Sequence, residues 1–277
     1  GIGLINLYQA TPVSGVYLPN AGLMWIVPLV IAIYGAVFYM NNLTSAKSSF
    51  KEQLAITKNK HTWIMSYIYI GTFGSFIGYS AAFPLLIKTQ FPSVTVAIAF
   101  LGPLVGSLSR PFGGLLADKV GGAIVTFWNF IAMGAATIGV LYFVGIKDFT
   151  GFLAMFLILF VTTGIGNGST YRMIPSIFRE ENLWKVRGSG EAVRAAAMKT
   201  ASIEAGAALG FIGAIGACGG YLIPSGFGKS IALTGGPQLA LEIYLAFYAT
   251  CLALTWWYYL RKAFTSAASV SLAQARI

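Results

Sequence analysis

Apolar residues along this chain gather in seven long stretches that are separated by short polar segments. A helix of about 20 apolar residues crosses the roughly 30 Å hydrocarbon core of a bilayer. Because lipid offers no hydrogen bonds, a spanning segment must satisfy its own backbone, as a helix does. The pattern therefore predicts an all-α integral membrane protein with seven transmembrane helices. The predicted spans are residues 23–41, 63–87, 94–116, 122–144, 151–175, 203–225 and 241–260.

The composition excludes a soluble globular domain. Hydrophobic residues make up 57% of the chain and charged residues only 9%, with a mean hydropathy of +0.74, whereas soluble domains carry about 25% charged residues. Neither a metal-ligand cluster nor a nucleophile–base pair is visible in the spans, where the two cysteines are isolated and the chain holds a single histidine. We therefore expect no enzyme activity, cofactor or metal site.

The net charge of +10 is explained by basic loops on one side of the membrane, and no nucleic-acid partner is expected. Thirteen Lys and Arg residues fall in linkers on one side, and Lys88, Lys147 and Lys229 fall on the other. The positive-inside rule places the thirteen in the cytoplasm. The span at 94–116 then runs from outside to inside, and the C-terminus is cytoplasmic.

The linker at 42–62 separates the first span from the other six. Phe50, Leu54 and Ile56 lie among lysines there, which predicts a short helix on the membrane surface. His61, at the end of this linker, is expected to be solvated or interfacial.

A second linker, residues 176–202, carries both charge signs and good helix-forming sequence, which predicts a cytoplasmic helical loop. One leading span before six others suggests part of a twelve-helix protein, and the chain opens as if inside a longer sequence. The expected organisation is the end of a first half at 1–41, an inter-half loop at 42–62, a six-helix half at 63–260 and a cytoplasmic tail at 261–277.

Arg110, Arg172 and Glu204 are the charged residues that lie clearly within the predicted spans, and each burial is costly. Arg172 is close enough to the cytoplasmic end of its span to reach the interface. Glu204 complements the positive end of a helix dipole, although a role in proton coupling stays open. A structural explanation is therefore favoured for both residues.

Arg110, by contrast, needs a functional explanation. It lies eight residues before Asp118, which marks the cytoplasmic turn, and is therefore about 12 Å deep. No acidic residue of the chain has a matching depth, so we expect Arg110 to face a cavity and to bind an anion. Its planar guanidinium suits a planar oxyanion. A salt bridge to a carboxylate elsewhere in the protein is the alternative.

The preceding span carries Tyr69, Phe73 and Phe76 at helical spacing on one face. Such a stripe is typical of packing, but the Tyr69 hydroxyl could donate to an anion while Phe73 excludes water.

Two segments are rich in glycine. Residues 162–171, "TTGIGNGSTY", lack the strand and lysine of a nucleotide loop and indicate a close helix contact. Residues 206–224 place glycines four apart at Gly206 and Gly210 and again at Gly216 and Gly220, the spacing of tight helix crossings. Whether these glycines serve packing alone or a sliding movement stays open.

"GGLLADKVGG" at 113–122 resembles the cytoplasmic loop motif of the major facilitator superfamily. "YIYIGTFGSFIGYSAAF", "LIKTQFP", "LSRPFGGLLADKVGG" and "AALGFIGAIGACGGYLIPSGFG" more specifically resemble the C-terminal half of NarK-type nitrate/nitrite porters. This resemblance covers essentially the whole chain.

The resemblance implies twelve helices in two halves, of which this chain would hold helices six to twelve. Arg110 matches an arginine on the eighth helix that holds substrate together with an arginine of the absent half. Tyr69 and Phe73 match residues that line the site. Residues 210–221 match a glycine signature in which Gly213 replaces an expected serine. Gly210 and Gly213 are therefore expected at the substrate.

The implied function is nitrate/nitrite antiport by alternating access in a bacterial inner membrane, by a monomer. The alternatives are nitrate–proton symport, transport of another small anion and, outside transporters, an anion channel. The residues expected to act in gating are Gly114, Asp118, Lys119, Gly121, Gly216 and Gly220.

Overall fold

The computed structural model describes residue 23 and residues 25–40 and 54–261 of the 277-residue chain. The chain divides into two units, Gly1–Lys47 and Ser48–Ile277, and each is described by itself. In the first unit, helix α3 covers Ile26–Tyr39 and has 14 residues. It rises about 21 Å, which is less than the hydrocarbon thickness. The predicted span 23–41 includes residues outside the described part.

In the second unit, the structure confirms the six further spans. Its described residues form six helical stretches that are long and apolar enough to cross a membrane. Their elements are α5 Lys60–Tyr69 with η3 Ile70–Gly74 and α6 Ser75–Gln90; η4 Val96–Phe100 with α7 Leu101–Val120; α8 Gly122–Gly145; α9 Phe149–Lys185; α10 Glu191–Ala217 with α11 Gly219–Thr234; and α12 Gln238–Thr255 with η5 Trp256–Leu260.

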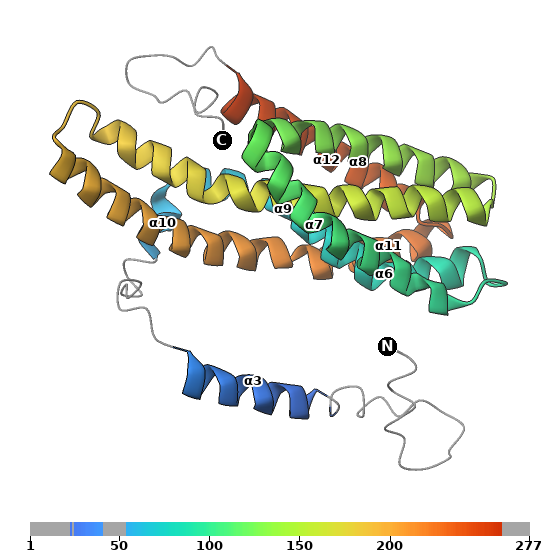
Figure 1. Ribbon diagram of the computed structural model, residues 1–277. Helices are drawn as coiled ribbons and strands as arrows, with labels where there is room; N and C mark the ends of the chain where they lie inside the picture. Colours follow the sequence, from blue (N-terminus) through green and yellow to red (C-terminus); the bar gives the residue numbers. More distant parts are fainter. Residues whose placement is uncertain (1–22, 24, 41–53, 262–277) are drawn as a thin grey trace. The chain divides into compact units, whose positions relative to one another are not determined.

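Helix α9 is the axis of this unit. It packs against α7, α8 and α10, and Figure 1 shows it running the length of the unit, with α8 and α12 beside one another. Aromatic rings fill the contact between α6 and α9, where Phe83 stacks on Phe156 with ring centroids 4.6 Å apart. Both rings are fully buried, so the core of the unit lies along α9.

A buried chain of hydroxyl groups ties α6 to α12. The Tyr248 hydroxyl donates to Ser75 Oγ at 2.8 Å and lies 2.5 Å from the Tyr79 hydroxyl. All three side chains are at most 1% exposed. Because none of these hydroxyl groups can reach water, their hydrogen bonds fix how α6 and α12 are rotated against each other.

The stretch α5–η3–α6 and the stretch α10–α11 each change their helical geometry where they contact one another. η3 is a π-helix, and the α-helical run of α10 ends at Ala217 before α11 begins at Gly219. The backbones meet there, because a Cβ on Gly219 would lie 2.4 Å from the Cα of Gly74. Small residues at a helix contact permit this approach.

The expectation of a long helical loop at 176–202 is wrong in extent. α9 continues to Lys185 and α10 begins at Glu191, so only five residues, 186–190, join them. The stretch at 203–225 likewise extends to Thr234. Hydropathy marks where apolar sequence ends, but polar helix formers continue a helix beyond that point.

The turn between the predicted spans 94–116 and 122–144 is also shorter than expected. α7 runs to Val120, so Asp118 and Lys119 belong to its last turn. Gly121 alone separates α7 from α8 and has a φ of 99°. That backbone conformation is strained for every residue except glycine, and it makes Gly121 a required junction.

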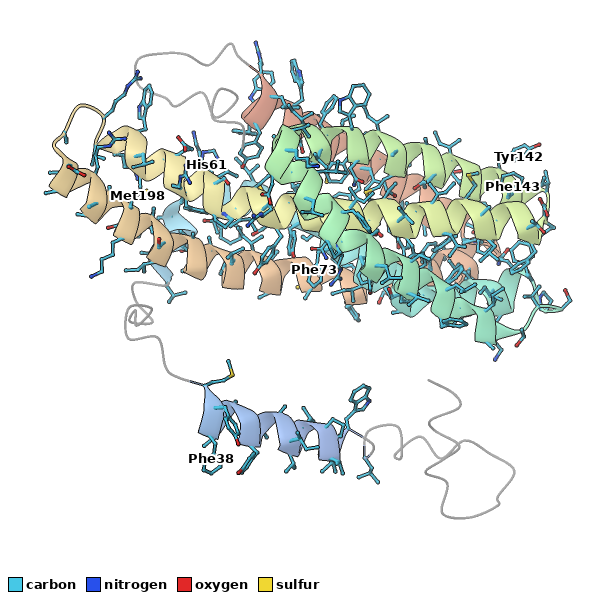
Figure 2. All side chains as sticks on the ribbon, in the orientation of Figure 1. Phe38, His61, Phe73, Tyr142, Phe143 and Met198 are labelled. Atoms are coloured by element: carbon cyan, nitrogen blue, oxygen red, sulfur yellow. The ribbon has the colours of Figure 1, made fainter. Side chains whose placement is uncertain are left out.

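Of the two environments expected for His61, solvated or interfacial, the solvated one is wrong. His61 is 7% exposed, and its Nδ1 lies 3.1 Å from the Tyr259 hydroxyl. Figure 2 places it in the half of the unit that contains the α9–α10 turn, with Tyr142 and Phe143 at the other end. Ile56, expected on a membrane-surface helix, is 5% exposed within the short helix Ile56–Lys58. Phe50 lies outside the described residues.

Candidate anion-binding site

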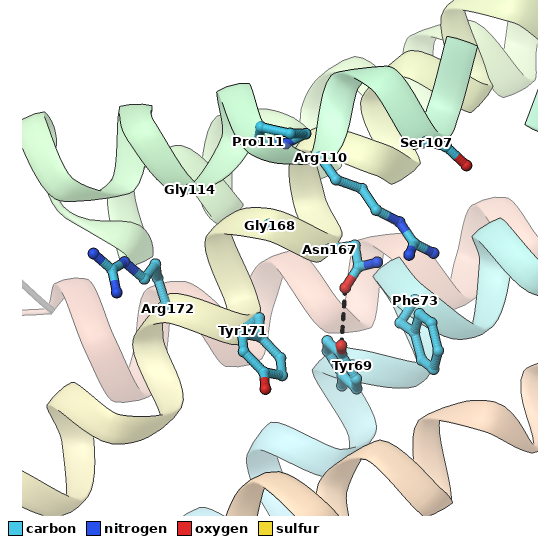
Figure 3. A pocket seen from close by; sticks show the side chains of 10 residues that line it. All are labelled: Tyr69, Phe73, Ser107, Arg110, Pro111, Gly114, Asn167, Gly168, Tyr171 and Arg172. Atoms are coloured by element: carbon cyan, nitrogen blue, oxygen red, sulfur yellow. Dashed lines mark hydrogen bonds between the residues drawn. The ribbon is translucent and has the colours of Figure 1, made fainter. Parts of the chain in front are cut away.

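Arg110 lies half-buried in the middle of α7 and borders a cavity of about 500 Å³. The cavity follows the contact between α7 and α9 beside α5 and η3 (Figure 3). Its lining consists of Tyr69, Phe73, Ser107, Arg110, Pro111, Gly114, Asn167, Gly168, Tyr171 and Arg172. The expected cavity therefore exists within the spans.

Two aromatic rings hold the guanidinium of Arg110. Its Cζ lies 4.2 Å from the ring centroid of Phe76 and 5.5 Å from that of Phe73. The negative face of a ring attracts a cation, and more strongly where water is excluded. The aromatic stripe of the stretch formed by α5, η3 and α6 thus packs on the charge itself.

Asn167 fixes the edge of the guanidinium. With the amide nitrogen of Asn167 donating to the Tyr69 hydroxyl at 2.8 Å, the amide oxygen accepts from Arg110 Nε at 2.9 Å and from Nη2 at 3.2 Å. In the opposite orientation Tyr69 donates to the amide oxygen (dashed in Figure 3), and the amide nitrogen then faces the donors of Arg110. The first orientation satisfies every group, so it is the one we adopt.

The charge of Arg110 has no protein counter-ion in the part of the chain that the structure describes. The three ion pairs there are Arg172–Asp118, Arg179–Glu180 and Lys185–Glu181. Asn167 engages Nε and Nη2 and leaves Nη1 and one Nη2 hydrogen for another acceptor. A cation held by neutral partners, with two donors on one edge, can bind a small planar oxyanion bidentately.

No family model matches the chain. The nitrate/nitrite transporter NarU of Salmonella typhimurium is 46% identical to it over 253 residues, which are 88% of this chain and 54% of NarU. NarU of Escherichia coli is 44% identical over 254 residues, 90% of this chain and 54% of that protein. The probable nitrate/nitrite antiporter NarK2 of Thermus thermophilus is 33% identical over 264 residues, which are 91% of this chain and 54% of that protein. The chain belongs to the NarK/NarU transporter family.

Membership of the NarK/NarU family confirms the resemblance found in the sequence and places the chain in the major facilitator superfamily. The chain spans about half the length of these relatives. It is thus a multi-pass membrane protein of transporter type, and it matches only part of each relative.

The structure brings together some of the residues expected at the substrate and not others. Arg110, Tyr69 and Phe73 line one cavity. Gly210 and Gly213 are not among its lining residues, and a Cβ on either would meet nothing within 4 Å. Their contact with substrate therefore stays a prediction.

The two glycine pairs of 206–224 behave differently. A Cβ on Gly216 would lie 2.6 Å from the ring of Tyr69, and one on Gly220 would lie 2.7 Å from the side chain of Ile77. This pair makes the tight helix crossing that its spacing predicts. Gly206 and Gly210 make no such contact within the described residues.

The close contact expected for 162–171 is confirmed between α7 and α9. A Cβ on Gly168 would lie 2.2 Å from the carbonyl oxygen of Arg110, and one on Gly164 would lie 2.1 Å from that of Gly106. The glycines bring Asn167 within hydrogen-bonding distance of Arg110.

Asn167 and the pairing of Arg172 are functional features that the sequence did not predict. An amide inside an apolar span is costly unless it is hydrogen-bonded, and this signal could have identified Asn167. Arg172 does not simply extend to the interface: its Nε and Nη2 donate to the two carboxylate oxygens of Asp118, each at 2.7 Å. Of the residues expected to act in gating, Gly114 lines the cavity and Asp118 holds Arg172.

Proposed function

We propose that this chain forms helices six to twelve of a twelve-helix transporter that exchanges nitrate for nitrite by alternating access. Arg110 binds the anion together with a second arginine from the other half. The basic linkers face the cytoplasm of a bacterium, and the site lies near the middle of the inner membrane. The names of the relatives, nitrate/nitrite transporters and a probable antiporter, support this assignment.

The observation that carries the proposal is the charge of Arg110, which, among the residues that the structure describes, only neutral groups contact. Asn167 accepts its hydrogen bonds, and Phe73 and Phe76 cover it. A cation inside a bilayer needs a partner because the hydrocarbon cannot solvate it. A substrate anion supplies that partner, and its release leaves the charge of Arg110 unpaired again. Such reversible binding is what a carrier requires.

The planar guanidinium of Arg110 favours a small planar anion. Nitrate and nitrite are planar and can accept two parallel hydrogen bonds from one guanidinium edge. The rings of Tyr69 and Phe73 stack beside Arg110, with their centroids 5.0 Å apart.

Exchange follows from the charges. When the site is empty, two facing arginines repel one another, so the halves close only when an anion neutralises them. Proton symport would need a titratable carboxylate at that depth, and Arg110 has none within its contacts in the described region. The empty carrier therefore returns slowly, and a second anion on the other side accelerates the return.

The experiment that tests the proposal measures nitrate–nitrite counterflow in proteoliposomes that contain the full-length transporter. We expect the wild type to exchange without a proton gradient and Arg110→Lys to lose almost all flux, because lysine keeps the charge but lacks the planar fork. Normal flux in Arg110→Lys would exclude the substrate role. A strict need for a proton gradient would indicate symport, and we expect this chain without the other half to be inactive.

A further inference from the structure

The cavity beside Arg110 contains a second arginine. On α7 it is lined by Ser107, Arg110, Pro111 and Gly114, and on α9 by residues 167, 168, 171 and 172. These positions form one face of each helix. The cavity is therefore elongated along the helices, and Figure 3 shows Arg172 at one end of the row and Ser107 at the other, with the guanidinium of Arg110 near the Ser107 end.

The two arginines are held in the same way. Arg110 uses Nε and Nη2 to contact the Asn167 amide oxygen, and Arg172 uses Nε and Nη2 to contact Asp118. A guanidinium has five N–H donors, so each retains the Nη1 group and one Nη2 hydrogen. The free edge of each can take a planar oxyanion bidentately.

Arg110 and Arg172 differ in their expected affinity for an anion because different side chains contact them. Asn167 is neutral, so Arg110 keeps its full charge, whereas the Asp118 carboxylate neutralises Arg172. The ion pair is solvent-accessible, with side chains 59% and 47% exposed, and exposed pairs contribute little to stability. An anion can therefore compete with Asp118 for Arg172, but it binds there weakly.

We propose that Arg172 is a second subsite for the transported oxyanion, about 12 Å beyond Arg110 toward the Asp118 end of α7. The inference rests on the proposed function and adds a place where the anion pauses between Arg110 and the cytoplasm. Asp118 is the built-in competitor at this subsite. Movement along a permeation path requires sites weak enough to release the ion, and the carboxylate supplies that weakness.

The test exploits the opposite effects of the two partners. A merely structural ion pair loses the same link whether Asp118→Asn or Arg172→Gln removes it, so both variants shift binding in one direction. In an anion subsite, Asp118→Asn frees the guanidinium and tightens the weak component of binding, by roughly tenfold for one nearby unit charge. Arg172→Gln removes that component.

The measurement is equilibrium binding of nitrate to the purified full-length transporter by titration calorimetry, together with exchange in proteoliposomes. We expect two components in the wild type, one in Arg172→Gln with the tight component kept within about twofold, and a tighter second component in Asp118→Asn. Arg179→Gln is the matched control. It removes a cation that is 60% exposed and paired with Glu180 on the same helix, outside the cavity lining, and we expect it to leave both components unchanged.

A single component in the wild type, or equal shifts in Asp118→Asn and Arg172→Gln, would overturn the subsite. If Arg172→Gln does not fold, Asp118→Asn decides alone, because weaker or unchanged binding in that variant contradicts the competitor role. The two proposals fail separately: flux lost in Arg110→Lys but binding unchanged in both Asp118→Asn and Arg172→Gln rejects only the subsite. Normal flux in Arg110→Lys rejects the proposed function itself.

Discussion

Asn167→Asp places a carboxylate against the guanidinium of Arg110 without changing the size of the side chain. Asn167 is 5% exposed and contacts both the Tyr69 hydroxyl and Arg110. A carboxylate accepts hydrogen bonds from both groups, so no polar atom loses its partner and the protein is expected to fold. The charge of Arg110 is then neutralised from within the protein.

The expected loss of affinity can be worked from the geometry. The new carboxylate lies about 3 Å from the guanidinium and roughly 6 Å from an anion on its free edge. At an effective dielectric constant of about 20, two like charges 6 Å apart repel by about 3 kcal/mol. That energy corresponds to a roughly hundredfold weaker binding constant for nitrate.

The assay is titration calorimetry with nitrate on the purified full-length transporter, with thermal unfolding measured in parallel. Asn129→Asp is the matched control. Asn129 is 6% exposed, its amide donates to Met133 Sδ and it is not among the residues that line the cavity. We expect this control to lose stability and keep its affinity, the reverse of Asn167→Asp. Nitrate affinity within threefold of wild type in Asn167→Asp would refute the reasoning.

Two further substitutions test how α7, α9 and α12 are held. Gly168→Ala drives a Cβ into the backbone of α7 and is expected to lower the unfolding free energy by about 1–3 kcal/mol or more. The control is Gly228→Ala, whose added Cβ meets nothing within 4 Å, and we expect it to keep or raise the unfolding free energy. Equal melting temperatures of the two variants would contradict the contact between α7 and α9. Tyr248→Phe leaves its two hydroxyl partners unsatisfied and is expected to cost about 1–3 kcal/mol, measured by thermal unfolding. Tyr142→Phe, at a side chain 62% exposed, is the control for that substitution, and a loss equal to that of Tyr248→Phe would contradict the buried network.

The helices were predictable because desolvation of the backbone forces long apolar segments to be helical. Their ends were less predictable. Lys185 and Glu191 lie in helix beyond the apolar sequence, since a helix that lies outside the membrane does not need apolar side chains. His61 was misjudged for a related reason: Tyr259, which it contacts, is nearly 200 residues away in the sequence.

The candidate site was partly predictable. Arg110 was identified by the cost of its burial, and Tyr69 and Phe73 by their helical spacing and by the family resemblance. Asn167 and the Arg172–Asp118 pair were missed because they depend on which face of α9 meets α7. Rotation of one helix against another is set by tertiary packing, and the periodicity of a single segment does not predict that rotation.

Nitrate binding by the Arg110→Lys variant is the sharpest test of whether the guanidinium of Arg110 binds the anion. Both residues carry one positive charge, so long-range attraction is retained, and only the fixed fork of donors is lost. We expect the full-length Arg110→Lys transporter to melt within a few degrees of wild type, while its nitrate affinity falls on the order of a hundredfold, as for the loss of two charge-assisted hydrogen bonds. Unchanged affinity in a folded Arg110→Lys protein would contradict this binding role.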